Sequence, residues 1–383
     1  MLALYQTVVT FLIFAVFLNL LNNLRLLRKP PAEGPLPPDL PMVSVLVPAR
    51  NEERNIGNCV SSLLAQDYPS KEIIVLDDDS SDQTASIVEA MAAENQGLTL
   101  VKGKPLPPGW IGKNYACHQL AQLAHGEWFL FTDADTIHSP CSISASLRGA
   151  IQEEADFLSL IPHIVTGSFW EKVLLPVIPF GLLGFWPISL MNSLPYPRVA
   201  MALGPFMLVK KEAYLKAGGY EAIHDNIVDD IALAREVKRA GGRIALMDGT
   251  DLVSVRFYRN FREIWDGLSK SIFGALDYSL FTAALYIAVG WSLFIYPYFL
   301  VFQSVAFREF HFLTFWVPSF QIALAWLMHY KVARRFKLSR LVPFLSFLTI
   351  GLTLLMIINS VRCSLIGKGL AWKGRYYNVG VRR

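Results

Sequence analysis

Charged residues are scarce in this chain of 383 residues: they make up 17% of it, whereas hydrophobic residues make up 53%. A soluble domain usually carries about 25% charged residues. The composition therefore excludes a disordered chain, a collagen-like chain and a basic nucleic-acid-binding arm. Cysteine is also scarce, and the four cysteines form no CxxC pair and no zinc-ligand spacing with histidine. Neither disulfides nor a zinc site are expected, and a reduced, cytosol-facing domain fits best.

Acidic residues are almost missing from the two ends of the chain. Residues 31–280 hold 30 acidic and 20 basic residues, whereas the flanking stretches hold 15 basic residues and one acid, Glu309. An acidic middle between apolar, basic ends is typical of a soluble domain held on a membrane. The basic residues then lie at the anionic cytoplasmic face.

The apolar runs predict an integral membrane protein. Residues 2–24 carry no charge and are followed by Arg25, Arg28 and Lys29, the reverse of a cleaved signal peptide. Three further apolar runs lie near 281–305, 312–329 and 341–361. The predicted domains are a transmembrane anchor over 1–24, a Pro-rich linker over 25–41, a cytosolic catalytic domain over 42–275, C-terminal transmembrane helices over 276–361 and a basic tail over 362–383. A bacterial inner (cytoplasmic) membrane is the expected location.

The basic tail conflicts with a simple count of spans. Six basic residues and no acid follow Val361, so the positive-inside rule places them in the cytosol. If the middle domain is cytosolic and all three C-terminal runs cross the membrane, the tail ends outside. Either one run is interfacial or re-entrant, or the rule fails here.

The middle of the chain alternates between β-rich runs and helical stretches. Strands are expected at 43–47, 72–77, 98–101 and 128–133, and helices at 52–66, 82–95 and 113–125. This alternation predicts an α/β fold with a mostly parallel, Rossmann-like sheet, in which ligands bind beyond the carboxyl ends of the strands. Residues 170–199 differ, because five prolines interrupt an apolar stretch. Helices lying in the interface are preferred there over a span or a re-entrant hairpin.

Five polar motifs fall at these strand ends or helix starts. They are VPARNEE (47–53), LDDDSSDQT (76–84), GWIGKNYA (109–116), DAD (133–135) and VDD (228–230). In the DAD motif, Asp133 and Asp135 point the same way and can hold a hard divalent cation. Asp229 and Asp230 open a helix, where a carboxylate caps the helix or presents itself to a substrate hydroxyl as a base.

Each motif also has an ordinary structural interpretation. Consecutive acids are common in capped, solvated turns, and Lys113 can be a solvated lysine at a loop–helix junction. His138, three residues after Asp135, can reach a metal there but is more often a loop residue. Trp265 and Lys270, just before an apolar run, are typical of membrane-interface anchoring.

Taken in order, the five motifs resemble those of the family 2 inverting glycosyltransferases with the GT-A fold, over about residues 40–275. The resemblance implies that Pro48, Arg50, Glu52 and Asp78 contact the nucleotide base and that Lys113 contacts the donor nucleotide. It implies that Asp135 holds Mg²⁺ or Mn²⁺, with Asp133 on the sugar nucleotide and beside the metal. It further implies that Asp230 is the base that activates the acceptor.

Some residues depart from the family pattern. Arg50 stands where Tyr is common, Asp229 where Glu is common and Asp79 where Gly is common. The QxxRW motif of the processive polysaccharide synthases is missing, since the matching stretch reads RNFREIW. The stretch 204–223 and the tail AWKGRYY are instead similar to membrane members that glycosylate lipids: ceramide glucosyltransferases, the hopanoid-associated type and, most of all, bacterial carotenoid glycosyltransferases.

The expected reaction is a single in-line displacement from a nucleotide-sugar, of the UDP-glucose type, onto a hydroxyl of a membrane lipid. The lipid is a carotenoid or a related isoprenoid or sphingolipid. Asp229, Trp265, Phe185 and Trp186 are candidates on the acceptor side. Alternatives are a polyprenyl-phosphate sugar transferase, a polysaccharide synthase and a catalytically silent membrane adaptor of the same fold. A transporter is disfavoured by spans nearly free of charge.

Overall fold

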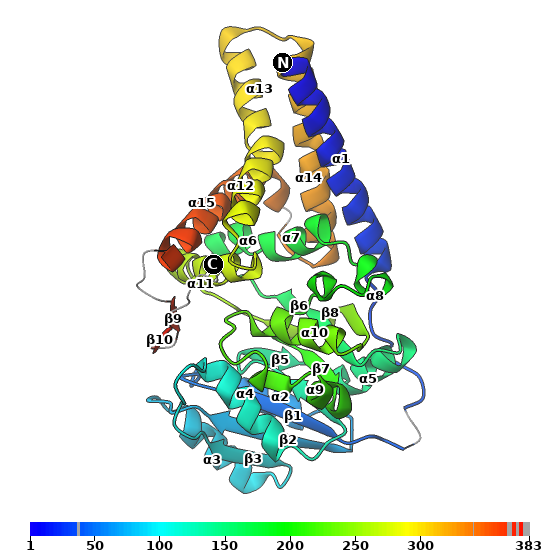
Figure 1. Cartoon of the computed structure of the whole chain (residues 1–383), viewed down its shortest axis with the longest axis vertical. Coiled ribbons are helices and arrows are strands. Elements are labelled where there is room, and N and C mark those ends of the chain that lie inside the picture. Colours follow the sequence, from blue (N-terminus) through cyan, green and yellow to red (C-terminus); the bar gives the residue numbers. More distant parts are fainter. Residues whose placement is uncertain (37–38, 340, 366–369, 373–374, 378–383) are drawn as a thin grey trace. The chain divides into compact units, whose positions relative to one another are not determined.

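The computed structural model describes residues 1–36, 39–339, 341–365, 370–372 and 375–377 (Figure 1). Its contacts divide the chain into two compact units. The helical unit comprises Met1–Leu26, Thr166–Pro187 and Tyr258–Arg383, and the α/β unit comprises Leu27–Val165 and Ile188–Phe257. Segments from both halves of the sequence therefore contribute to each unit.

The α/β unit is built on a sheet that has eight strands in the described part of the chain, in the order β3-β2-β1-β4-β7-β6-β8-β5. The strands are β1 (Val43–Ala49), β2 (Lys71–Asp77), β3 (Leu98–Lys102), β4 (Trp128–Phe131), β5 (Thr136–His138), β6 (Phe157–Ile164), β7 (Met207–Lys210) and β8 (Ile244–Val255). Strands β1 to β4 pair in parallel, and β7 runs antiparallel to both of its neighbours. The mostly parallel α/β fold predicted from the alternation of strands and helices is confirmed.

Helices cover the sheet, and the strands between them are almost wholly apolar. The helices are α2 (Ile56–Leu64), α3 (Thr84–Glu94), α4 (Gly112–Leu123), α5 (Ser142–Gln152), α8 (Leu190–Ser193), α9 (Lys211–Lys216) and α10 (Asp229–Arg239), with short 3₁₀ turns η1 (Pro197–Val199) and η2 (Gly219–Glu221). All residues of β1 but Pro48 are buried. Near-continuous apolar runs are expected where both faces of a parallel sheet are covered.

The helical unit holds four apolar helices long enough to cross a membrane, counted over the described residues: Leu2–Leu26, Leu280–Phe307, Phe312–Arg335 and Val342–Leu365. The first is α1. The second consists of α12 (Leu280–Phe294) and α13 (Tyr296–Phe307), the third of η3 (Phe312–Trp316) and α14 (Val317–Arg335), and the fourth of η4 (Val342–Leu345) and α15 (Ser346–Leu365). The unit also contains α6 (Phe169–Leu174), α7 (Val177–Phe185), α11 (Phe261–Ala275), β9 (Leu370–Trp372) and β10 (Arg375–Tyr377).

Residues 170–199 form short segments, α6, α7, α8 and η1, and none approaches the length of a span. Ser168 begins α6 with a capping box, in which its hydroxyl accepts from the Glu171 N–H and the Glu171 carboxylate accepts in return. Asn23 of α1 donates to the carbonyl of Leu183 near the end of α7, at 2.8 Å. The prolines thus break the stretch as predicted, and its location in the membrane interface stays a prediction.

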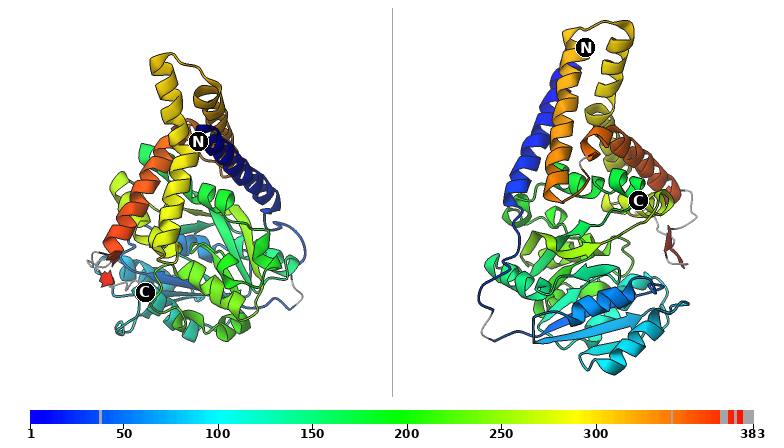
Figure 2. Two further views of the ribbon diagram at one scale, coloured as in Figure 1. Left: turned by 45° about the horizontal axis from the view of Figure 1, so that its top comes forward. Right: turned by 180° about the vertical axis from the view of Figure 1, so that it is seen from behind.

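The last long helix, α15, begins about halfway along α14 and runs back towards α11 (Figure 2). At its start, Ser346 Oγ lies 3.3 Å from the hydroxyl of Tyr298, which also accepts from Nε1 of Trp326 at 2.7 Å. Trp326 is in the middle of α14. Near its end, Ser360 Oγ accepts from the N–H of Phe273 in α11, at 3.1 Å. Because α11 directly precedes α12, α15 descends alongside α12 towards the end at which α12 begins.

Candidate functional site

The predicted polar motifs meet at one edge of the sheet. Strands β1, β2 and β4 are parallel neighbours, so their carboxyl ends lie side by side. The Asp78 N–H donates to the carbonyl of Ala49 at 2.8 Å, which joins the ends of β1 and β2. Asp133 follows β4 at the same edge. The residues predicted to bind the donor therefore share one end of the sheet.

The loops after β1 and β2 are locked together. The Arg50 guanidinium donates to the carbonyl oxygens of Asp78 and, at 2.9 Å, of Asp79. The Glu52 N–H donates to Thr84 Oγ1 at 2.7 Å, at the first residue of α3. Asn51 has a φ of 52° and Asp79 a φ of 59°, a left-handed conformation that Asn and Asp tolerate better than most residues. Pro48, the last residue but one of β1, leads into this rigid corner.

Lys113 bridges two carboxylates that come from distant parts of the sequence. It lies in the first turn of α4, and its Nζ is 2.8 Å from Asp133 Oδ1 and 3.3 Å from Asp229 Oδ2. Its side chain is 21% exposed. These contacts raise the pKa of Lys113 well above its ordinary value in spite of burial, so it stays a cation. The lysine therefore links the end of β4 to the start of α10.

Asp230 is held through both of its oxygens. Oδ1 accepts from the Ile231 N–H at 2.7 Å, and Oδ2 accepts from the Gly204 N–H at 2.9 Å. Burial raises the pKa of Asp230 to about 7, with a further contribution from the negative charge of Asp229, while Lys113 and the two N–H donors act in the opposite direction. A fixed carboxylate whose pKa is near neutrality suits general base catalysis.

Gly204 lies at the centre of this cluster. A Cβ on this residue would be 3.3 Å from Asp133 Oδ2, 3.3 Å from Lys113 Nζ and 3.7 Å from Asp230 Oδ2. The structure thus brings Asp133, Lys113, Asp229 and Asp230 together, as the motifs predicted, around a glycine that sequence reasoning did not single out. The available signal was weak: a Gly-Pro pair before β7 is an ordinary turn until the folded chain places it beside the acids.

The donor set near Asp135 suits a hard cation that also binds phosphate oxygens. Asp135 is half-buried two residues after Asp133, whose Oδ1 is already paired with Lys113. No group of three or more His, Cys, Asp and Glu residues able to hold a metal occurs among the residues described. Mg²⁺ is commonly held by one or two carboxylates together with substrate phosphates, and this arrangement fits that pattern.

His138 is a buried residue of β5, and the structure gives it a role in packing. Its Nε2 lies 3.0 Å from the hydroxyls of Thr132 and Thr136, and its Nδ1 lies 3.3 Å from Ser142 Oγ. Burial lowers the pKa of His138 to about 3, so the ring is neutral. Because both ring nitrogens face buried hydroxyls, the interpretation as a metal ligand is dropped. The expectation of a loop residue is also wrong, since His138 is the last residue of β5.

The acceptor-side candidates other than Asp229 belong to the helical unit. The rings of Phe185 and Tyr286 have centroids 6.1 Å apart, and Trp265 packs against Phe261 at 5.8 Å. Trp186, at the end of α7, is half-buried, and its carbonyl accepts from the side chain of Asn23. These residues are apolar and partly accessible, as an acceptor-side role requires.

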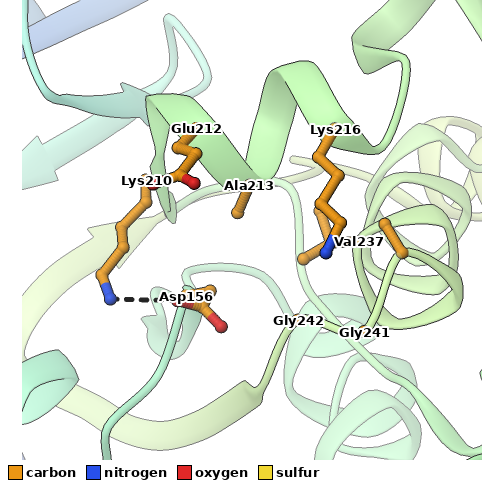
Figure 3. Close-up of a pocket in the computed structure, with 9 residues that line it drawn as sticks. Asp156, Lys210, Glu212, Ala213, Lys216, Val237, Gly241 and Gly242 are labelled. Carbon is orange, nitrogen blue, oxygen red and sulfur yellow. Dashed lines mark hydrogen bonds and ion pairs between the residues drawn. The ribbon is translucent and has the colours of Figure 1, made fainter.

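A hollow of about 160 Å³ lies at the opposite edge of the sheet (Figure 3). Lys210 pairs in register with Trp128, the first residue of β4. Asp133 of the candidate site, in contrast, follows the last residue of that strand. Lys210 Nζ contacts Asp156 Oδ1 at 3.0 Å, and Asp156 Oδ2 accepts from the Arg243 N–H at 3.0 Å. Because none of the motif residues lines it, this hollow is separate from the candidate site.

Comparisons with known proteins agree with this geometry. Residues 44–217 match the model of Glycosyl transferase family 2. Over 235 residues the chain is 28% identical to 4,4'-diaponeurosporenoate glycosyltransferases of Staphylococcus aureus strains MRSA252 and USA300. The match covers 60% of this chain and spans 60% of the length of those relatives.

A solved structure shares the fold over nearly the whole chain. It is that of the mannosyltransferase PcManGT from Pyrobaculum calidifontis in complex with GDP-Man and Mn²⁺. It is 19% identical in sequence, aligns with a TM-score of 0.60, and covers 95% of this chain and 99% of that one. The fold is thus GT-A-like, and residues 44–217 resemble a family of sugar-transferring enzymes. Residues 44–217 are thus similar to Glycosyl transferase family 2, and the chain is a distant homologue of the 4,4'-diaponeurosporenoate glycosyltransferases of S. aureus.

Proposed function

We propose that this protein is an inverting glycosyltransferase that moves a sugar from a nucleotide-sugar of the UDP-glucose type to a hydroxyl of a membrane lipid. The lipid is a carotenoid or a related isoprenoid or sphingolipid. The observation that carries the proposal is the cluster in which Lys113 joins Asp133, beside the donor motifs, to Asp229, beside the proposed base Asp230. The relatives in S. aureus, named for a carotenoid-type acceptor, support this class of lipid.

The donor occupies the carboxyl edge of β1, β2 and β4. The base of the nucleotide contacts the corner formed by Pro48, Arg50, Glu52 and Asp78, whose rigidity supports a fixed orientation. Lys113 neutralises charge on the diphosphate side, and Asp133 accepts hydrogen bonds from the sugar nucleotide. In every such contact the protein supplies a preformed, partly buried polar group, which strengthens electrostatic interactions.

Asp135, assisted by Asp133, would hold Mg²⁺ or Mn²⁺ together with the diphosphate oxygens. A divalent cation there offsets the negative charge that develops on the leaving nucleoside diphosphate. The Mn²⁺ of the structurally similar mannosyltransferase supports this choice of ion. Lys113 supplies a second positive charge close to the same oxygens.

Asp230 acts as the base in a single displacement. Its carboxylate takes the proton of the acceptor hydroxyl while the acceptor oxygen attacks the anomeric carbon, and the bond to the diphosphate breaks. The configuration at that carbon inverts, without the covalent sugar–enzyme intermediate that a retaining carboxylate forms. The hydrogen bonds from Gly204 and Ile231 keep the carboxylate in one orientation throughout.

The membrane arrangement proposed is three crossings and one re-entrant segment. In the chain's direction, α1 crosses the membrane and delivers Arg28 and Lys29 to the cytosolic side. The helix α12–α13 crosses from the cytosolic side to the opposite side. α14 crosses back, which brings Lys331, Arg334 and Arg335 to the cytosolic side. The segment that ends with α15 then enters the membrane only to the level of Trp326 and turns back to the cytosolic side. The contacts of Ser346 and Ser360 support this path. The catalytic domain and the basic tail then both face the cytosol, and the positive-inside rule is satisfied.

The deciding experiment is lipid analysis of cells with and without the chain, followed by reconstitution. Purified protein in lipid nanodiscs is given UDP-glucose, Mn²⁺ and a hydroxylated carotenoid, and the lipids are separated by thin-layer chromatography. A pigment of lower mobility that carries the labelled sugar is the expected product. Transfer to polyprenyl phosphate alone would reject the proposed acceptor. No transfer from any nucleotide-sugar tested would reject the proposed reaction.

A further inference from the structure

Asp229, next to the proposed base, is held by two donors. Besides Lys113 Nζ, the hydroxyl of Tyr220 donates to Asp229 Oδ2, at 3.3 Å. Tyr220 is fully buried and Asp229 is 6% exposed. Burial and nearby negative charge raise the pKa of Tyr220 well above its ordinary value, so its hydroxyl keeps its proton. The tyrosine hydroxyl is therefore available as a donor to this carboxylate.

The backbone around Tyr220 is fixed from several sides. Gly219 has a φ of 54°, and a Cβ there would lie 2.5 Å from the ring of Tyr214, so only glycine fits. The hydroxyl of Tyr214 accepts from the Tyr220 N–H at 3.1 Å. The ring of Tyr220 stands edge-on to that of Phe131, the last residue of β4, with centroids 5.0 Å apart.

The segment between Tyr220 and Asp229 is also tied to the helix that carries Lys113. The buried amide of Asn114 donates to the carbonyls of Ile223 and Asn226, both at 2.8 Å. The Ile111 N–H donates to the carbonyl of His224 at 2.9 Å. The two donors to Asp229 thus belong to one cross-linked framework that spans the donor and acceptor sides of the site.

We propose that Tyr220 is a positioning residue: its hydroxyl fixes Asp229, and Asp229 together with Lys113 fixes the electrostatic setting of Asp230. The proposal rests on the proposed function, in which Asp230 is the base. Tyr220 does not contact the reacting atoms and acts through Asp229. Without the hydroxyl, the Asp229 carboxylate keeps its ion pair with Lys113 and loses the constraint that directs its charge towards Asp230.

The test compares Tyr220→Phe with Tyr68→Phe in the whole chain, with transfer of labelled glucose from UDP-glucose to a hydroxylated carotenoid in the presence of Mn²⁺ as the readout. The Tyr68 hydroxyl is also buried and donates to the carbonyl of Pro41 at 2.7 Å, away from the acids, so it controls for the loss of a buried phenol. We expect Tyr220→Phe to lower kcat about 10-fold, because hydrogen bonds to charged groups are among the stronger ones, with KM for the donor changed less than about 2-fold. Tyr68→Phe should keep kcat.

A double-mutant cycle separates positioning from general stability. If Tyr220 acts through Asp229, then Tyr220→Phe adds no further loss of kcat to Asp229→Asn, whereas a merely structural effect would add to it. Wild-type kcat in Tyr220→Phe, or additive losses, would overturn the inference. Asp230→Asn in the same assay tests the base itself, so full activity of that variant counts against the proposed function and not against Tyr220 alone.

Discussion

At the scale of single residues, the site is a problem of charge balance. Asp133 and Asp229 both pair with the cation of Lys113, and Asp230 lies beside them with its charged form disfavoured. Removing one partner of a buried ion pair is costly because the other is left without compensation. The lysine is therefore needed for the cluster to hold together before any donor binds.

The first prediction concerns the base. Asp230→Asn keeps the shape of the side chain and removes its ability to take a proton, so transfer to a hydroxyl acceptor should fall by about 10²- to 10⁴-fold. Stabilisation of the protein by UDP and Mn²⁺ in a thermal shift should persist. Retained transfer would contradict the role of Asp230 and would instead favour a phosphate acceptor, which needs no base.

The second prediction is a pH dependence. The ionised form of Asp230 is the active one, and its pKa is about 7. We therefore expect kcat/KM to be low at pH values below about 7 and to rise as the pH increases through that value. In Asp229→Asn a neighbouring negative charge is gone, so the pKa of Asp230 falls and the rising limb moves to lower pH. The ratio of the rates at pH 6 and pH 8 reports the shift. An unchanged pH profile in Asp229→Asn would contradict the electrostatic interaction between Asp229 and Asp230.

The third prediction concerns the space at the centre of the site. Gly204→Ala places a methyl group between the donor-side and base-side groups, and displacing their charged ends by a few tenths of an ångström should lower kcat several-fold. Gly97→Ala is the matched control, since no atom lies within 4 Å of a Cβ there. If the two variants have equal kcat at equal thermal stability, Gly204 is not at the reacting centre.

Sequence reasoning found the charged members of the site and missed the uncharged ones. Lys113, Asp133 and Asp230 stand in motifs whose residue types suggest chemistry wherever they occur. Gly204 and Tyr220 have no such signal, because a glycine before a strand and a tyrosine after two glycines are ordinary. Their importance arises from contacts across the folded chain, which the order of the motifs does not reveal.

At the scale of elements, the strands were predicted more closely than the helices. β2 was expected at 72–77 and spans Lys71–Asp77, since a buried strand between two polar turns has clear limits. The helix expected at 52–66 begins only at Ile56, because the residues before it form the turn that contacts the loop after β2. Hydrogen bonds to a distant part of the chain hold these residues in a turn and not in the helix. Local helix propensity cannot predict such contacts.

The aromatic residues of α7 have different surroundings, and this gives the fourth prediction. Phe180 is fully buried, with its ring stacked on that of His329 at a centroid distance of 3.9 Å. Phe185 and Trp186 are half-buried. Phe185→Ser with Trp186→Ser should reduce transfer to lipid and spare donor hydrolysis. Phe180→Ser should destabilise the helical unit by about 3–5 kcal/mol and reduce both.

Equal loss of lipid transfer and donor hydrolysis in the Phe185 and Trp186 variant would contradict an acceptor role for α7. The measurement is the ratio of glycolipid formed to UDP released, in nanodiscs of constant lipid composition. Thermal denaturation of each variant identifies the losses that come from unfolding.

At the scale of the whole molecule, the fifth prediction concerns topology. An epitope tag after Arg383 and a tag before Met1 should lie on opposite sides of the membrane, with the C-terminal tag on the side of the catalytic domain. Gln6 of α1 donates to the carbonyl of Leu313 at 2.9 Å, so the N-terminus lies near the turn between α13 and α14. Protease treatment of sealed inside-out and right-side-out vesicles distinguishes the two sides, and a pair of tags cleaved in the same vesicles would refute three crossings.

The course of α15 has a consequence for the synthesis of the protein. In the proposed topology, translocation is complete once α14 has crossed, because no residue after Arg335 has to reach the far side of the membrane. The following segment then stays on the side that it already occupies, and α15 enters the membrane and packs against α11 and α12 from that side. Truncation at Arg335 should therefore leave the orientation of the catalytic domain unchanged.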